Sequence, residues 1–94
     1  MNGTWFVRSS EVLSRVVGSE VLLAAPGRAD VAHLSETAGA VWRLLEAPQT
    51  VPSLARALAY AYGVSSETAA ASIQPLLSEL LKEGWVDCIA DADD

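Results

Sequence analysis

The first part of the chain has the hydrophobic pattern of short β-strands. Residues 12–17 and 20–24 are rich in Val and Leu, and Gly18-Ser19 stands between them. A glycine that leads a two-residue connection between apolar runs is typical of a type II′ hairpin. Pro26-Gly27 marks a second turn, since proline presets φ and glycine accepts a positive φ. Residues 29–34 then predict a third strand, and the simplest arrangement is an antiparallel meander.

After residue 34 the apolar positions change to the spacing of helices. A first apolar stripe recurs at i, i+3, i+4 and i+7, and comprises Ala38, Val41, Trp42 and Leu45. Serine or threonine precedes each helical segment as a potential N-cap, and Pro48, Gly63 and Gly84 provide the stops. The pattern therefore predicts three helices, at about residues 36–47, 51–62 and 66–83.

Three further segments complete the predicted organisation. Pro75 lies inside the third helix and should bend it, because proline cannot donate to the carbonyl of Ala71. Trp85-Val86 can add a short closing strand. The apolar segment around Trp5 can cover the first strand of the meander, which would leave residues 29–34 as an open edge.

Length and charge limit the possible classes of protein. The 94 residues make one domain, with an expected core of about residues 12–87 and an acidic tail, 88–94, that we expect to fray. The net charge is −6, and the basic residues are scattered, so nucleic acid is an unfavourable partner. No stretch resembles a membrane span or a signal peptide, and Cys88 is the only cysteine. We therefore expect a cytoplasmic protein that does not bind membranes.

The residues that usually carry chemistry do not form a catalytic or metal-binding pattern. His33 is the only histidine and has no Cys or His partner at ligand spacing. Glu79 and Glu83 lie one helical turn apart, which fits a solvated face or a contact with a basic partner. Phosphate loops and nucleophile elbows are also missing. We predict a protein that is not an enzyme and that has no cofactor or metal.

The predicted edge strand and the third helix suggest a binding surface. An open edge can accept another peptide as an added strand. The third helix has Ile73, Leu77 and Leu80 along one line, with Leu76 and Leu81 beside it. This broad apolar arc fits either a deeply buried helix or a helix with one flank lining a groove beside residues 29–34.

The order and spacing of several short motifs resemble the PqqD-like family. They lie between Val12 and Asp87 and include Val21-Leu22-Leu23, His33-Leu34-Ser35-Glu36-Thr37-Ala38, Val41-Trp42-Arg43-Leu44-Leu45, residues 50–58 and Leu80-Leu81-Lys82-Glu83-Gly84-Trp85-Val86. The chain departs from the family pattern at Ser35, where asparagine is frequent, at residues 47–49, where an Asp-Gly turn is usual, and at Pro75.

The resemblance implies a fold and a function. The fold would be α+β and winged helix-turn-helix-like: a three-stranded antiparallel β-meander followed by three α-helices. The function would be that of a RiPP recognition element, which binds the leader segment of a ribosomally synthesised precursor peptide and delivers it to a modifying enzyme. The leader would add to the third strand and pack against the third helix. Carried over to this sequence, the peptide-binding residues are Asp30, Val31, Ala32, His33, Leu34, Ile73, Leu76, Leu77 and Leu80.

The implied partners are the precursor peptide and a tailoring enzyme such as a radical SAM enzyme, a protease or a cyclase. Two alternatives stay open. One is a winged-helix DNA-binding regulator, which the acidic third helix disfavours. The other is an adaptor subunit that binds a folded partner enzyme through the apolar groove. An open edge also permits a homodimer through that strand.

Overall fold

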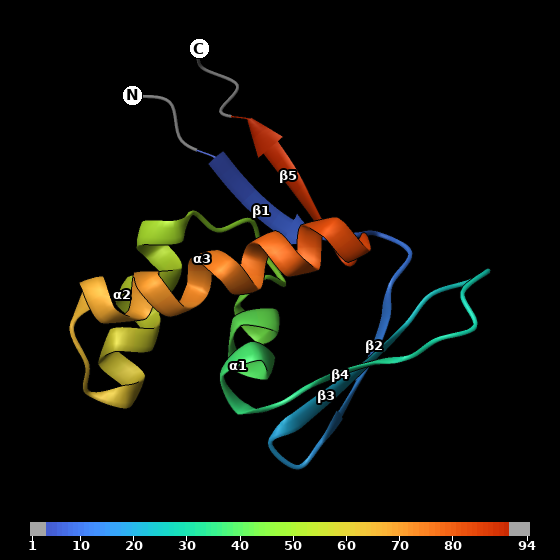
Figure 1. Cartoon of the computed structure of the whole chain (residues 1–94), viewed down its shortest axis with the longest axis horizontal. Helices are drawn as coiled ribbons and strands as arrows, with labels where there is room; N and C mark the ends of the chain where they lie inside the picture. Colours follow the sequence, from blue (N-terminus) through green and yellow to red (C-terminus); the bar gives the residue numbers. More distant parts are fainter. Residues whose placement is uncertain (1–3, 91–94) are drawn as a thin grey trace.

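The computed structural model describes residues 4–90 and has an α+β fold, as predicted. The molecule has two small sheets and three helices, and the long helix α3 runs across it (Figure 1). In chain order the elements are β1 (Thr4–Arg8), β2 (Leu13–Val17), β3 (Glu20–Ala24), β4 (Ala32–Leu34), α1 (Glu36–Leu44), α2 (Val51–Tyr62), α3 (Ser66–Glu83) and β5 (Val86–Ala90).

The predicted meander is confirmed, with strand order β2-β3-β4 and antiparallel pairing throughout. Gly18 has φ +64°, whereas Ser19 does not have a positive φ, as a type II′ hairpin requires. At the second turn the N–H of Arg28 donates to the carbonyl of Ala25 at 3.2 Å, and Gly27 has φ +81°. Proline followed by a glycine of positive φ makes this a type II turn.

The third strand is shorter than predicted, because residues 29–31 do not pair with β3. The type of the preceding turn explains the difference. A type II turn splays the chains that flank it, whereas the primed turn at Gly18 matches the twist of paired strands. The chain after Pro26-Gly27 therefore runs apart from β3 and pairs with it only from Ala32 onward.

The helices agree closely with the sequence pattern. α2 has a capping box between Thr50 and Ser53 and ends at Gly63, while α3 begins after the N-cap Ser65 and ends at Gly84. α1 ends at Leu44, three residues before the predicted end. α3 continues through Pro75 as one helix from Ser66 to Glu83, so proline does not divide it into two elements.

β1 and β5 form a second sheet. The predicted closing strand is confirmed as β5, but its pairing with β1 was not predicted. β1 pairs with β5 in antiparallel register, so the prediction that the Trp5 segment covers the meander is wrong. β2 is instead a second open edge among the described strands, and all five of its residues are exposed. The expected fraying of the tail is wrong for residues 88–90, which belong to β5, whereas residues 91–94 lie outside the described part.

The core lies between the inner face of the meander and the three helices. Gly39 lets α1 approach the sheet closely, since a Cβ there would lie 3.3 Å from the carbonyl oxygen of Ser19. Trp42 and Trp85 are core residues, whereas Trp5 is 38% exposed and its neighbour Phe6 is buried. The core comprises Phe6, Val21, Leu23, Leu34, Val41, Trp42, Leu45, Leu54, Ala55, Leu58, Ala69, Ile73, Leu77, Leu80, Trp85 and Val86.

Candidate peptide-binding edge and groove

The open edge of β4 presents the backbone of His33. The two-residue hairpin makes Val17 and Glu20 a hydrogen-bonded pair, so alternate residues of β3 bond to opposite neighbouring strands. The pairs that bond across β3 and β4 are then Val21 with Leu34 and Leu23 with Ala32. His33 lies between these pairs, so its N–H and C=O point away from the sheet. These groups are the ones that an added strand would engage.

A groove begins where β4 passes into α1 and is bounded on its other side by α3. The hollow there has a volume of about 510 Å³. Its lining comes from the start of α1 and from two residues of α3 that are one helical turn apart: Ser35, Glu36, Thr37, Ala38, Ser72 and Leu76. A peptide added to β4 would therefore meet the flank of α3. The hollow beside β2, in contrast, is lined by β2, β3 and Val31 and by no helical residue.

Three of the four predicted α3 site residues belong to the core. Ile73, Leu77 and Leu80 are 0%, 2% and 3% exposed. Only Leu76 is half-buried and borders the groove. Of the two readings of this helix, deep burial holds for the line through Ile73, and groove lining holds for the flank through Leu76. The three core residues support the groove from beneath.

The predicted strand residues are distributed over three environments. Leu34 is buried in the core and Ala32 is half-buried, so their side chains face inward. His33 is exposed on the outer face of the sheet, where its Nε2 contacts the carboxylate of Glu20.

The two residues before β4 are also exposed. Val31 lies beside the outer face and borders a small hollow with Leu13 and Leu22. Asp30 is exposed and faces the C-terminal end of α3 through Arg28.

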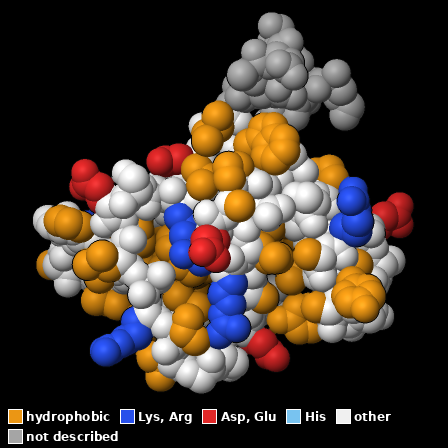
Figure 2. Space-filling view, turned by 180° about the vertical axis from the view of Figure 1, so that it is seen from behind, with side chains coloured by type: hydrophobic (Ala, Val, Ile, Leu, Met, Phe, Trp, Pro, Cys, Tyr) orange, Lys and Arg blue, Asp and Glu red, His pale blue; other side chains and the backbone are white. Residues whose placement is uncertain are grey.

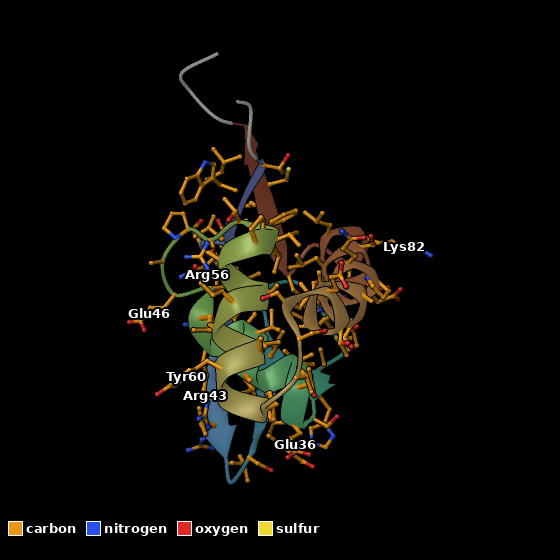
Figure 3. The ribbon with its side chains drawn as sticks, turned by 90° about the vertical axis from the view of Figure 1, so that its left-hand side faces the viewer. Glu36, Arg43, Glu46, Arg56, Tyr60 and Lys82 are labelled. Carbon is orange, nitrogen blue, oxygen red and sulfur yellow. The ribbon has the colours of Figure 1, made fainter. Side chains whose placement is uncertain are left out.

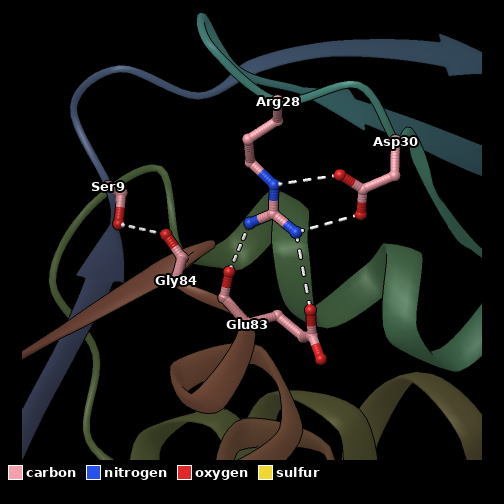
Figure 4. Close-up of polar contacts among 5 residues, drawn as sticks. All are labelled: Ser9, Arg28, Asp30, Glu83 and Gly84. Atoms are coloured by element: carbon pink, nitrogen blue, oxygen red, sulfur yellow. Dashed lines mark hydrogen bonds and ion pairs between the residues drawn. The ribbon is translucent and has the colours of Figure 1, made fainter.

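Arg28 connects the loop before β4 to the end of α3 (Figure 4). Its Nε and Nη2 donate to the two carboxylate oxygens of Asp30 at 3.3 and 3.0 Å. Its Nη1 donates to the main-chain carbonyl of Glu83, and its Nη2 lies 3.4 Å from that residue's carboxylate. The guanidinium also stacks on Trp85, at 4.0 Å from the ring centroid. One side chain thus joins the strand side of the groove to the helix side.

The electrostatics of this junction favour the charged forms of both partners. The hydrogen bond from Arg28 lowers the pKa of the Asp30 carboxyl below its usual value. The hydrogen bond to Asp30 and its negative charge raise the pKa of the Arg28 guanidinium, with a further contribution from Glu83. Both groups therefore keep their charges across the physiological pH range, and the junction has no pH switch there.

Arg28, Ser72 and Thr37 belong to the candidate site but were not predicted from the sequence. Arg28 follows a turn and has no neighbour in sequence that indicates its contact with Glu83, 55 positions away. Ser72 had a detectable signal, because it lies four residues before Leu76 and so on the same helical flank. Thr37 lies in the first turn of α1, where the structure places it across from Ser72.

The charge of α3 and of the surface disfavours binding to DNA. α3, the helix that would read DNA, has three acidic residues, and its single basic residue, Lys82, points away from the rest of the molecule (Figure 3). On the face seen from behind, basic side chains are separate and interspersed with acidic ones (Figure 2). None of the helices in residues 4–90 is long and apolar enough to cross a bilayer. The same residues contain no cluster of three His, Cys, Asp or Glu side chains that could hold a metal ion.

Comparisons with known proteins give one family and one structure. Residues 20–86 match the family model described as "Coenzyme PQQ synthesis protein D (PqqD)". No curated protein matches the sequence. A similar solved structure is "TbiB1 in Complex with the TbiA(beta) Leader Peptide", with a TM-score of 0.78 and 21% identity over 86% of this chain and 94% of that one. The matched family region begins at β3 and ends at the first residue of β5, so it contains β4, the groove and α3.

Proposed function

This chain belongs to the PqqD family, and from that premise we propose that it binds the leader segment of a ribosomally synthesised precursor peptide. The leader adds to the open edge of β4 as a fourth strand and packs against the flank of α3 that contains Leu76. The protein has no catalytic role of its own and delivers the bound leader to a tailoring enzyme in the cytoplasm. The similar fold of TbiB1, whose structure contains a leader peptide, supports this proposal.

The observation that carries the proposal is the outward-facing backbone of His33 beside the groove. Main-chain hydrogen bonds to His33 would set the register of the leader, and the groove would select alternate side chains. We propose antiparallel addition, because every pair in this sheet is antiparallel. The N-terminal end of the leader then lies near Leu34 and Ser35, and its C-terminal end lies near Arg28. Binding orders a flexible peptide, so we expect a sub-micromolar Kd.

A matched pair of proline variants tests which edge binds the leader. His33→Pro removes an outward N–H from β4, and Val16→Pro removes one from β2, where the same hairpin rule points the backbone of Val16 outward. Proline is tolerated at such positions on edge strands. The probe is a fluorescein-labelled synthetic peptide that covers the leader of a candidate precursor, chosen from short reading frames next to the gene for this chain. Fluorescence anisotropy measures its Kd.

We expect His33→Pro to weaken binding at least tenfold and Val16→Pro to leave the Kd within twofold of the wild type. His33→Ala serves as a second control, because it removes the contact with Glu20 but keeps the backbone N–H. Circular dichroism confirms that each variant is folded. Equal affinities for His33→Pro and the wild type, or the same loss in both proline variants, would contradict addition at β4.

A further inference from the structure

A second hollow continues the groove beyond the first turn of α1. It has a volume of about 150 Å³ and shares Thr37 and Ser72 with the larger hollow beside β4. The rest of its lining comes from the end of α2, the loop after it and the beginning of α3: Leu58, Tyr62, Val64, Thr68 and Ala69. Because two lining residues are common to both, the two hollows are adjoining parts of one surface.

The chemistry of this second hollow is mostly apolar. Leu58 and Ala69 are buried and form its floor, whereas Tyr62 and Val64 are 46% and 43% exposed at its rim. A cavity of about 150 Å³ with an apolar lining is large enough for a benzene ring. The hollow therefore fits one aromatic or branched aliphatic side chain. Such a side chain would cover Tyr62 and Val64, which are otherwise partly exposed to solvent.

We propose that this second hollow binds an apolar side chain of the leader, on the N-terminal side of the residues that add to β4. This inference rests on the proposed function, because the antiparallel leader begins at the end of β4 from which the groove leads to Thr37 and Ser72. The hollow is a specificity pocket: strand addition reads the backbone of any extended peptide, whereas this pocket distinguishes leaders that have a large apolar residue at the correct distance.

A matched pair of tyrosine variants tests the pocket. Tyr62→Ala removes the aromatic rim, and Tyr60→Ala changes the same residue type on the same helix, where Tyr60 is 92% exposed and points away from α3 (Figure 3). Val64→Ser is a second rim variant, in the loop after α2. The probes are two synthetic peptides: the complete leader of the candidate precursor that binds the wild type, and the same leader shortened from its N-terminus to the segment that adds to β4.

We expect Tyr62→Ala and Val64→Ser to weaken binding of the complete leader about tenfold and about threefold, with no change for the shortened leader. Tyr60→Ala should leave both affinities unchanged. If the wild type binds the complete leader but Tyr62→Ala and Val64→Ser bind it as well as Tyr60→Ala does, the pocket proposal is wrong and strand addition stands. If the rim variants lose affinity equally for both peptides, the pocket proposal is also wrong. If the wild type binds none of the candidate leaders, both proposals are overturned.

Discussion

At the scale of single residues, Arg28 has the clearest structural role in the groove. It contacts Asp30 on the strand side and Glu83 on the helix side, and it stacks on Trp85. Only arginine provides a planar fork that bonds a carboxylate with two nitrogens and also stacks on an aromatic ring. Because its guanidinium joins both sides, Arg28 holds the loop before β4 against the end of α3, at the end of the groove where we propose that the C-terminal end of the leader lies.

Replacing Arg28 should therefore affect leader binding. Arg28→Gln keeps a polar side chain of similar length but loses the charge, both ion pairs and the cation–π contact. We expect the Kd for the complete leader to rise about fivefold, a moderate effect because the ion pairs are partly exposed. Arg15→Gln is the control, since Arg15 is exposed on β2 at the far edge of the sheet. Isothermal titration calorimetry measures both variants, and equal affinities would show that the junction does not shape the groove.

At the scale of elements, α3 has two flanks with different tasks. The line through Ile73, Leu77 and Leu80 packs in the core, and the flank through Ser72 and Leu76 borders the groove. Pro75 lies on the exposed side, where its missing N–H leaves the carbonyl of Ala71 without its usual intrahelical donor. The helix nevertheless continues to Glu83, because packing of its buried line stabilises it more than proline destabilises it.

Removing this proline should stabilise the protein. Pro75→Ala restores one helical hydrogen bond and a good helix former, and the gain is reduced because alanine gives the unfolded chain more freedom. We expect the free energy of unfolding to rise by about 2 kcal/mol, measured by urea denaturation at equilibrium. Ser78→Ala is the control at another exposed position of α3 and should change it by less than about 0.5 kcal/mol. Destabilisation by Pro75→Ala would mean that the fold requires the proline.

At the scale of the whole molecule, the β1–β5 sheet joins the two ends of the chain. Phe6 pairs with Cys88 in β5 and forms two backbone hydrogen bonds with Gln49, from Phe6 N to Gln49 O at 2.7 Å and from Gln49 N to Phe6 O at 2.9 Å. Its side chain is part of the core. β1 thus links β5, which follows α3 in the chain, to the segment between α1 and α2.

Truncation of Phe6 should destabilise the entire fold. Phe6→Ala removes a buried ring and leaves a cavity, so we expect a loss of about 3 kcal/mol in the free energy of unfolding. Trp5→Ala is the matched control in the same strand and should cost about 1 kcal/mol or less, because Trp5 is 38% exposed. A domain of this size has only a few kcal/mol of stability, so the first variant should unfold near 37 °C. Thermal and urea unfolding that are the same for both variants would show that β1 is peripheral.

The sequence by itself determined the features that depend on local chemistry. The primed turn at Gly18, the capped start at Thr50 and the glycine ends at Gly63 and Gly84 were predicted correctly, because each depends on a few adjacent residues. For α3 the sequence allowed Ser65 or Ser66 as the start, and the structure has Ser65 as the N-cap. The strand order of the meander followed from short connections between neighbouring strands. Motif order and spacing also gave the family, which the match over residues 20–86 confirms.

Only the tertiary structure decided what depends on contacts between distant segments. Two examples are the pairing of β1 with β5 and the contact of Arg28 with Glu83, which both join residues that are far apart in sequence. A third is α3, where contacts with distant segments decide which residues are in the core and which border the groove. Periodicity showed that α3 has a broad apolar arc but not which part would be covered. That outcome depends on where the chain joins the sheet as β4. The type II turn and the contact of Arg28 with Glu83 position the segment that leads into this strand.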